Sequence, residues 1–322
     1  MARTALARGT QVTCLARGVA GAVPEGATWV RADRDVREAY DEVRDRDWDD
    51  VVDVSWQPGQ VRSALAALAD RAGHWTYVSS CSVYASHGTP DADESAELLP
   101  ALEGDAADGE HYGQAKVACE QACRDSVGDR LLVARSGLIG GYGDPSDRFG
   151  YWVARFAAAA EGSPAWAASP AVLLPADEQA PTQTLDVHDL AEWLVRAGED
   201  GVTGTFNAVG ERVPLGTVLH AAAKAAGFTG SVVRVPSSFL RDQQVEEYMG
   251  PRSLPLWIAD PDWAGFSARD GAAARAAGLT TRPLDELVAD ALRWERERGL
   301  GRERRAGLTP EQERELVQAW SG

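Results

Sequence analysis

Short apolar stretches alternate with segments of helical periodicity through the first two-thirds of the chain. The short stretches carry β-branched and aromatic residues, whereas the longer segments place apolar residues three or four positions apart. This alternation is typical of βαβ units that build a parallel sheet. The predicted strands are 12–16, 28–31, 51–55, 75–79, 131–135 and 206–209, and the predicted helices are 35–44, 60–71, 112–126, 151–160 and 188–197.

The pattern loosens after residue 214. It predicts a helix at 215–226, a short strand at 232–235, a stretch containing Pro and Trp up to residue 263, and helices at 283–298 and 310–320. We therefore expect residues 1–210 to form the parallel α/β core and residues 211–322 to contribute most of a smaller C-terminal lobe.

The beginning of the sequence departs from the pattern of a doubly wound fold. Residues 1–9 fit the end of an amphipathic helix, and the strand at 12–16 follows without an earlier strand or glycine-rich turn. In such folds the first strand is central, and its turn binds a dinucleotide pyrophosphate through helix-end N–H groups. We therefore expect a Rossmann-like doubly wound parallel sheet whose first strand and phosphate loop are missing, and correspondingly weak dinucleotide binding.

Composition excludes several classes of partner. The net charge of −17 argues against nucleic-acid binding, which normally needs a basic face. The four cysteines have no zinc-like spacing, and no metal site is predicted. No apolar run approaches the roughly 20 residues that span a bilayer, so we expect a cytoplasmic protein that does not bind membranes and has reduced thiols.

Two motifs carry the chemistry. Residues 77–84 read Tyr-Val-Ser-Ser-Cys-Ser-Val-Tyr at a predicted strand end, and residues 112–116 read Tyr-Gly-Gln-Ala-Lys at the start of a predicted helix. The next strand leads into Arg-Ser-Gly-Leu-Ile-Gly-Gly-Tyr-Gly at 135–143. In this order the segments resemble the extended short-chain dehydrogenase/reductase family, of the NAD-dependent epimerase/dehydratase type. The resemblance implies hydride transfer coupled to proton transfer at a hydroxyl or carbonyl carbon.

The family's proton-transfer residues correspond to Ser80, Tyr112 and Lys116. Residues four apart share a helical face, so Lys116 is expected to lie near the phenol of Tyr112 and to lower its pKa. The resemblance implies that Tyr112 exchanges the proton and that Ser80 binds the same substrate oxygen. Ser79 and Ser82 are alternatives to Ser80, and a serine at a strand end also commonly bonds to the backbone.

The resemblance also implies a cofactor, NADP or NAD. Arg17 follows the first predicted strand, where an arginine suits the 2′-phosphate of NADP, although a solvated loop arginine is the alternative. Asp33 resembles an adenine-contacting acid and could instead cap a helix. Trp56, next to Ser55, stands where the family usually has small residues. The expected cofactor contacts are Arg17, Asp33, Ser79, Tyr112, Lys116, Gly137 and Ile139.

Substrate contacts are expected from Ser82, Arg148 and Trp152. Arg148 opens a segment over the predicted active site and could bind an anionic group or form a surface ion pair. Trp152 could line an aromatic pocket, although large aromatic residues mostly fill cores. Asp189 is expected to cap a helix, and His188 to be structural.

These observations favour an NAD(P)-dependent oxidoreductase or epimerase that acts on a small molecule, with a sugar-nucleotide-like compound as one option, and that forms a homodimer through the helix carrying Tyr112. The alternative is a member of the fold without redox turnover, either a binding protein or a non-redox acid–base enzyme. The missing phosphate loop favours this alternative, whereas the intact Ser, Tyr and Lys set favours the redox enzyme.

Overall fold

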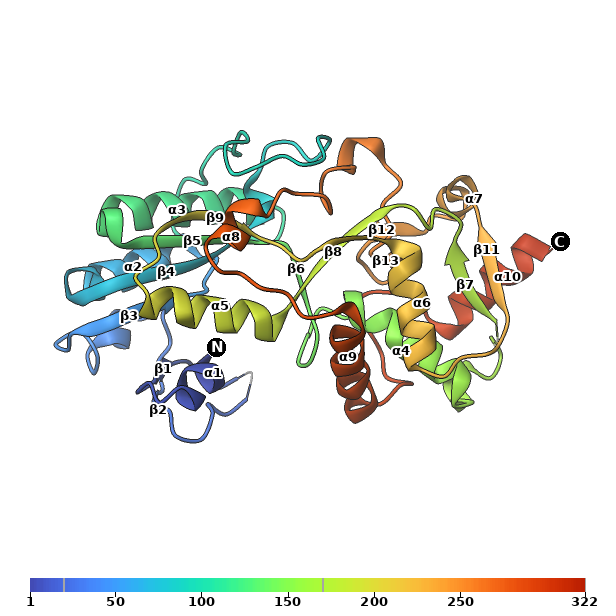
Figure 1. The fold of residues 1–322 in the computed structure, drawn as a ribbon, viewed down its shortest axis with the longest axis horizontal. Helices are drawn as coiled ribbons and strands as arrows, with labels where there is room; N and C mark the ends of the chain where they lie inside the picture. Colours follow the sequence, from blue (N-terminus) through green and yellow to red (C-terminus); the bar gives the residue numbers. More distant parts are fainter. Residues whose placement is uncertain (20, 170, 322) are drawn as a thin grey trace.

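The computed structural model of the protein describes residues 1–19, 21–169 and 171–321. It is a mixed α/β structure with parallel sheets (Figure 1). The strands are β1 (Thr13–Leu15), β2 (Thr28–Val30), β3 (Trp48–Asp53), β4 (Ala72–Ser80), β5 (Leu131–Ser136), β6 (Leu138–Gly140), β7 (Val172–Pro175), β8 (Pro181–Asp186), β9 (Gly204–Ala208), β10 (Arg212–Pro214), β11 (Val232–Val235), β12 (Glu246–Tyr248) and β13 (Ser253–Pro255).

Most helices follow a strand in the chain. The α-helices are α1 (Ala2–Ala7), α2 (Pro58–Leu68), α3 (Tyr112–Val127), α4 (Arg148–Ala160), α5 (Val187–Glu199), α6 (Leu215–Ala225), α7 (Ser237–Asp242), α8 (Ala272–Ala276), α9 (Leu284–Arg298) and α10 (Pro310–Ser321). The 3₁₀ turns are η1 (Arg37–Tyr40), η2 (Ala69–Arg71), η3 (Cys81–Val83), η4 (Gly128–Arg130), η5 (Pro164–Trp166) and η6 (Pro261–Trp263). No helix in these ranges is long and apolar enough to cross a membrane.

The main sheet has the strand order β3-β4-β5-β9, and all its pairs are parallel. Helices α2 and α3 pack together on one face, while α5 packs on the other face (Figure 1). Both faces are buried, which explains why β5 is buried at every position and begins with four apolar residues in a row instead of an alternating pattern. This three-layer arrangement confirms the predicted parallel α/β fold.

The N-terminal elements form a separate unit beside β3. Strands β1 and β2 pair in parallel, and α1 packs against α5 with an ion pair between Arg8 and Glu199 at 2.6 Å. Among the described residues no strand pairs with the remaining edges of β1 and β3. A hollow of about 160 Å³ lies there, lined by Leu15, Val51 and Leu68 among others. The parallel sheet is therefore interrupted at the position that the sequence pattern predicts.

The C-terminal elements build a second core around α4. Helices α4, α6 and α9 pack against one another, and β7 pairs in parallel with β11 beside them. Trp152 and Trp257 are fully buried in this core. Since α4 and β7 belong to it as well, part of the chain before residue 211 packs with the C-terminal lobe. The boundary at residue 210 remains a prediction.

Most predicted elements are present, and one predicted helix is wrong. Residues 35–44 form only the single 3₁₀ turn η1 within a series of turns, although Ala39, Tyr40 and Val43 of this segment are buried in the core. Asp33 accepts the N–H of Asp35 at 3.1 Å within a local turn, but it caps no helix, because η1 begins at Arg37 with Val36 at its N-cap. The short strands β6, β7, β8, β10, β12 and β13 were not predicted.

Candidate active site

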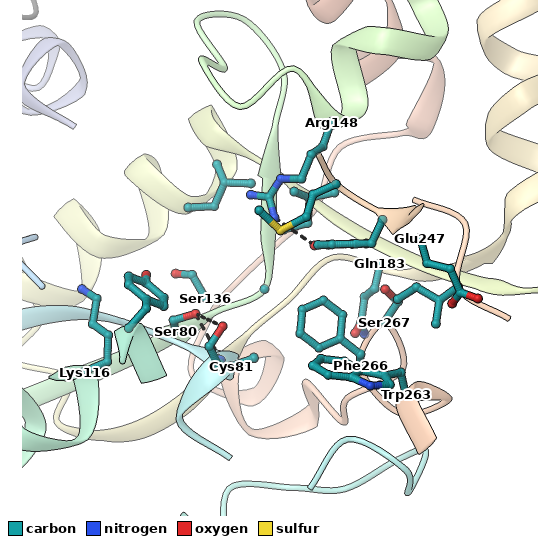
Figure 2. Close-up of a pocket in the computed structure, with 18 of the residues that line it drawn as sticks. Ser80, Cys81, Lys116, Ser136, Arg148, Gln183, Glu247, Trp263, Phe266 and Ser267 are labelled. Carbon is teal, nitrogen blue, oxygen red and sulfur yellow. Dashed lines mark hydrogen bonds between the residues drawn. The ribbon is translucent and has the colours of Figure 1, made fainter. Parts of the chain in front are cut away.

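A cavity of about 1110 Å³ opens between the carboxyl ends of β4 and β5 and the C-terminal lobe (Figure 2). Ligand sites of doubly wound folds lie at this edge of the sheet. Eight of the predicted site residues line the cavity: Ser79, Ser80, Ser82, Tyr112, Lys116, Gly137, Ile139 and Arg148.

Ser80 and Tyr112 come together because α3 begins directly against the turn after β4. Ser80 accepts the N–H of Ser82 at 3.1 Å and so caps η3. A Cβ on Gly113 would lie 2.3 Å from the carbonyl oxygen of Ser82, so only glycine permits this approach. The glycine after the tyrosine therefore brings the two hydroxyl-bearing side chains to one wall.

Lys116 is 3% exposed and points into the sheet edge. Its Nζ donates to the carbonyl oxygens of Val78 at 2.6 Å and Ser55 at 3.1 Å, and it lies 4.8 Å from the ring centroid of Tyr77. Burial lowers the pKa of Lys116 to about 8. The ammonium is therefore held by backbone carbonyls near the site.

The pKa of Tyr112 moves in the direction opposite to the one that the Tyr-x-x-x-Lys motif suggests. Burial raises the pKa of Tyr112 above its ordinary value, and the groups that partly oppose this rise are the hydroxyl of Ser80 and the charge of Arg148. Desolvation of the phenolate outweighs the attraction of nearby cations. The phenol is therefore protonated at neutral pH.

Ser79 faces a buried ionic network, away from Ser80. Successive side chains on a strand point to opposite faces. The Ser79 hydroxyl donates to Glu120 at 2.6 Å, and Glu120 also binds the guanidinium of Arg135 at 2.9 Å. The hydroxyl of Ser79 is thus engaged, which leaves Ser80 and Ser82 beside the cavity.

Three predicted residues lie apart from the cavity. Trp152 is fully buried, and its indole N–H donates to the carbonyl oxygen of Pro255 at 2.6 Å, so we leave it out of the proposed site. Arg17 and Asp33 lie beyond β1 and β2, with side chains 55% and 42% exposed and 3.7 Å between Nη1 and Oδ2. They form a solvated ion pair.

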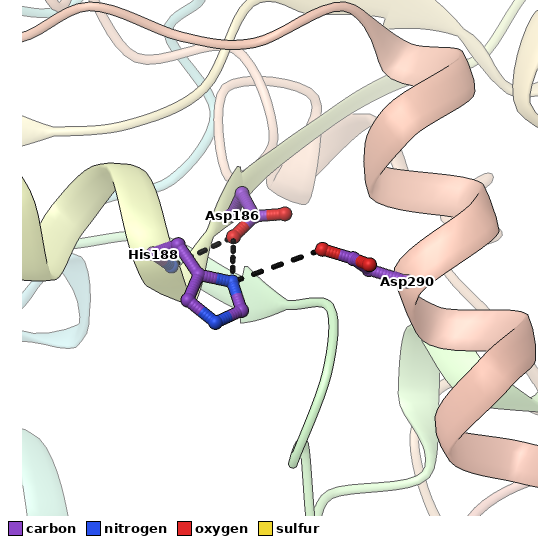
Figure 3. Close-up of side chains that lie close together, drawn as sticks. All are labelled: Asp186, His188 and Asp290. Carbon is purple, nitrogen blue, oxygen red and sulfur yellow. Dashed lines mark hydrogen bonds and ion pairs between the residues drawn. The ribbon is translucent and has the colours of Figure 1, made fainter. Parts of the chain in front are cut away.

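A second polar cluster joins α5 to α9 (Figure 3). Oxygen and nitrogen atoms of Asp186, His188 and Asp290 lie within 4.8 Å of one another. The guanidinium of Arg282 faces the same group, at 3.7 Å from Asp186 and 3.5 Å from Asp290. Because Arg282, and Arg293 at 3.0 Å from Asp290, already pair with these carboxylates, we interpret the cluster as an ion-pair network.

The helix cap near this cluster was assigned to the wrong residue. Asp186 caps α5 by accepting the N–H of His188 at 2.7 Å, whereas Asp189 binds the backbone and side chain of Arg282, both at 2.8 Å. The strand β8 ends at Asp186, so the cap lies three residues earlier than predicted.

The far wall of the cavity was missed from the sequence. It consists of Tyr248, Met249, Ile258, Trp263 and Phe266, which come from β12 and the segment around η6. The only signal was the Trp- and Pro-containing stretch up to residue 263, which has no periodicity that assigns it to a cavity.

The cavity fits the nicotinamide ring of a dinucleotide better than its phosphates. Val54 is 57% exposed at its wall, and with Ile139 it offers apolar surface for a planar ring. The phosphates would need free N–H groups at a helix start. At the start of α2, however, the N–H of Gly59 donates to the carbonyl oxygen of Asp105 at 2.8 Å. The side-chain amide of Gln57 exchanges hydrogen bonds with the backbone of Ala107.

Comparison with known proteins identifies the fold. No family model and no curated protein matches the chain. A candidate epimerase from Burkholderia cenocepacia is 21% identical, with a TM-score of 0.66 over 92% of this chain and 93% of its own. UDP-N-acetylglucosamine 4-epimerase from Bacillus cereus is 16% identical, with a TM-score of 0.61 over 91% and 93%. UDP-glucose 4-epimerase from Thermus thermophilus, solved with NAD, is 21% identical, with a TM-score of 0.55 over 91% and 94%.

These similarities confirm the resemblance to epimerase-like short-chain dehydrogenases/reductases at the level of the fold. They extend over more than nine-tenths of the chain, including the C-terminal lobe. The chemistry has to be argued from the side chains in the cavity, because one fold hosts many activities.

Proposed function

We propose that the chain is an enzyme of the extended short-chain dehydrogenase/reductase family that acts on a hydroxyl or carbonyl carbon of a small molecule. The observation that carries this proposal is the meeting of Ser80 and Tyr112 at one wall of a cavity of about 1110 Å³. Lys116 is buried beside them. The epimerases of similar fold support the same reaction class.

Tyr112 acts as the proton donor to the substrate oxygen. Because burial raises the pKa of this phenol, it holds its proton at neutral pH and releases it to an oxygen that gains negative charge. Ser80 donates a hydrogen bond to the same oxygen, and Arg148 stabilises the phenolate that remains. In the reverse direction the phenolate removes the hydroxyl proton.

A nicotinamide cofactor would supply or accept the hydride at the neighbouring carbon. Ser80, Tyr112, Lys116, Gly137 and Ile139 are the residues that would surround its nicotinamide end. The choice between NAD and NADP, the cytoplasmic location and a homodimer through α3 belong to the same proposal. Structural neighbours are described in complexes with NAD, NADPH or UDP-glucose, which makes these compounds the first probes.

The test compares the wild type with Tyr112→Phe. A panel of UDP-glucose, secondary alcohols and ketones is incubated with NAD, NADP and their reduced forms. Nicotinamide absorbance reports net oxidation or reduction, and chromatography of the sugar nucleotide reports epimerisation, which leaves the absorbance unchanged. Removing a general acid lowers turnover by about 10²- to 10⁴-fold. The control is Tyr142→Phe. Tyr142 lies between β6 and α4, and its hydroxyl donates to Glu297 of α9 in an exposed region.

Two outcomes would contradict the proposal. If Tyr112→Phe keeps most of the wild-type turnover, the proton donor is another group. If the wild type turns over no member of the panel with any nicotinamide, redox chemistry fails and the non-redox alternative gains support. The engaged N–H of Gly59 at the start of α2 is the observation that favours this alternative.

A further inference from the structure

The cavity wall opposite the proton-transfer residues is aromatic. Figure 2 shows Ser80 and Lys116 on one side, Phe266 and Trp263 on the other, and Arg148 reaching toward the space between them. Phe266 contacts Tyr248 and Trp263 edge-on, with ring centroids 4.9 and 5.4 Å apart. Phe266 therefore links the other two rings into one continuous aromatic wall.

One face of the Trp263 indole packs against His87, and the side chain remains partly exposed to solvent. His87 stacks on its indole at a centroid distance of 4.8 Å and an interplanar angle of 18°, and Arg269 donates to His87 Nδ1 at 2.9 Å. Trp263 nevertheless remains 44% exposed. Met249, which also lines the cavity, is exposed as well, and a flexible thioether adapts to the shape of an apolar ligand. Large apolar surface left open in a cavity indicates a ligand.

Tyr248 is held in a strained conformation at this wall. Its φ angle is +68°, in the left-handed region that an aromatic residue rarely adopts, and its N–H donates to the carbonyl oxygen of Trp257 at 3.0 Å. Such strain persists where the surrounding structure imposes it, and it is common at ligand sites. Here the conformation places the ring of Tyr248 between Phe266 and Arg148.

Arg148 brings a cation that has no ion-pair partner among the described residues. Its Nη1 donates to the Tyr248 hydroxyl at 3.2 Å, and its guanidinium lies 5.2 Å from the centroid of that ring. Two nearby carboxylates serve backbone groups. Asp144 accepts the N–H of Ser146 at 2.7 Å, and Glu247 accepts the N–H of Ala259 at 2.8 Å. A guanidinium with free donors in a cavity is suited to an anion.

We propose that the substrate carries an aromatic ring, which packs against Trp263 and Phe266, and an anionic group, which binds Arg148. This inference rests on the proposed function for the reacting carbon, which would lie at Ser80 and Tyr112. The proton-transfer residues, the aromatic wall and Arg148 then contact three different parts of one molecule. The substrate class is a hydroxy or oxo compound that bears both an aryl and an anionic group.

Binding of three probes tests the two recognition elements separately. 2-Naphthoate has the ring and the charge, 2-naphthol has the ring alone, and decahydronaphthalene-2-carboxylate has the charge on a saturated body of similar size. Calorimetric titration should give the tightest binding for 2-naphthoate. The margin should be about tenfold over naphthol, for the charged hydrogen bond, and about fivefold over the saturated acid, for the aromatic contacts.

Two variants remove one margin each. Arg148→Gln should abolish the preference for naphthoate over naphthol and keep the aromatic preference. Trp263→Leu should reduce the preference for naphthoate over the saturated acid and keep the charge preference. Trp320→Leu, on α10 outside the residues that line the cavity, is the matched control and should keep both.

Equal affinities for the three probes would overturn the proposed substrate class. So would a charge preference that persists in Arg148→Gln, or an aromatic preference that is unchanged in Trp263→Leu. Titration needs neither turnover nor a nicotinamide. The substrate class can therefore fail while the Tyr112→Phe result stands, and the opposite combination is equally recognisable.

Discussion

Replacing Lys116 with methionine should stabilise the fold at neutral pH while weakening proton transfer. Methionine matches the length of the lysine stem and fills irregular apolar space. The side chain it replaces is 3% exposed, and its ammonium has no carboxylate partner among the described residues. The charged lysine therefore carries a desolvation cost that the methionine lacks.

The pKa of Lys116 sets the size of this effect. The lowering of the Lys116 pKa from the ordinary 10.5 to about 8 means that the charged side chain destabilises the folded state by about 3 kcal/mol. The methionine variant lacks the hydrogen bonds to the carbonyl oxygens of Ser55 and Val78, which together contribute about 2 kcal/mol. The Ser55 carbonyl oxygen still accepts a hydrogen bond from the Tyr77 hydroxyl. The net expectation is stabilisation by about 1 kcal/mol at pH 7.

The pH dependence gives the sharper test. The folded state binds fewer protons than the unfolded state between pH values of about 8 and 10.5, so the stability of the wild type rises with pH in this window. Relative to the variant, the wild type should gain about 2 kcal/mol between pH 7 and 9.5. Urea unfolding of both proteins at the two pH values measures this difference.

Lys224→Met is the matched control, because Lys224 is exposed and pairs with Asp285 on the surface. Its stability difference from the wild type should stay constant between the two pH values. A Lys116→Met variant that is less stable than the wild type by more than 1 kcal/mol at pH 7, or whose difference is independent of pH, would refute the reasoning.

Three further outcomes are expected. Glu120→Gln should destabilise the fold by about 3–5 kcal/mol in urea unfolding, because it leaves Arg135 buried without its counter-charge. Burial alone would raise the pKa of Glu120, but Arg135 brings it below the ordinary value, so the wild type should lose this stability below about pH 4.5 and the variant should not. Arg34→Ala should cost about 3 kcal/mol and increase hydrogen exchange in β1 and β2, since Arg34 links the segment after β2 to Asp53 at 2.6 Å. Unchanged exchange would contradict this link. Titration with NAD and NADP should give binding weaker than micromolar, because the N–H of Gly59 at the start of α2 is engaged, and micromolar affinity would contradict the fit argued above.

The sequence predicts the core of the fold because periodicity reports burial. A strand buried on both faces, such as β5, begins with an unbroken apolar run, and the amphipathic helix α5 has one apolar stripe. The short strands of the C-terminal lobe, such as β12 with its three residues, are too brief for any period to develop. Their pairing is set by contacts between distant segments.

The site was predictable where a motif fixes local geometry. Ser80 and Tyr112 belong to motifs whose positions follow from a strand end and a helix start. The aromatic wall depends on how β12 and η6 fold back over the main sheet, which no local pattern encodes. Trp152 and Trp263 show this limit, since one fills a core and the other lines the cavity, although both look alike in sequence.

The electrostatics of the site follow from burial more than from the spacing of charged residues. A lysine four residues after a tyrosine suggests a cation beside a phenol, yet the folded chain directs Lys116 to the carbonyls of Ser55 and Val78. Arg148, from a different lobe, is the cation that opposes the raised pKa of Tyr112. The same guanidinium faces the aromatic wall, so an anionic substrate group bound there would reduce its pull on the phenol. Substrate binding would then keep Tyr112 protonated, as the acid role in reduction requires, but it would also weaken the stabilisation that Arg148 gives to the phenolate after proton transfer.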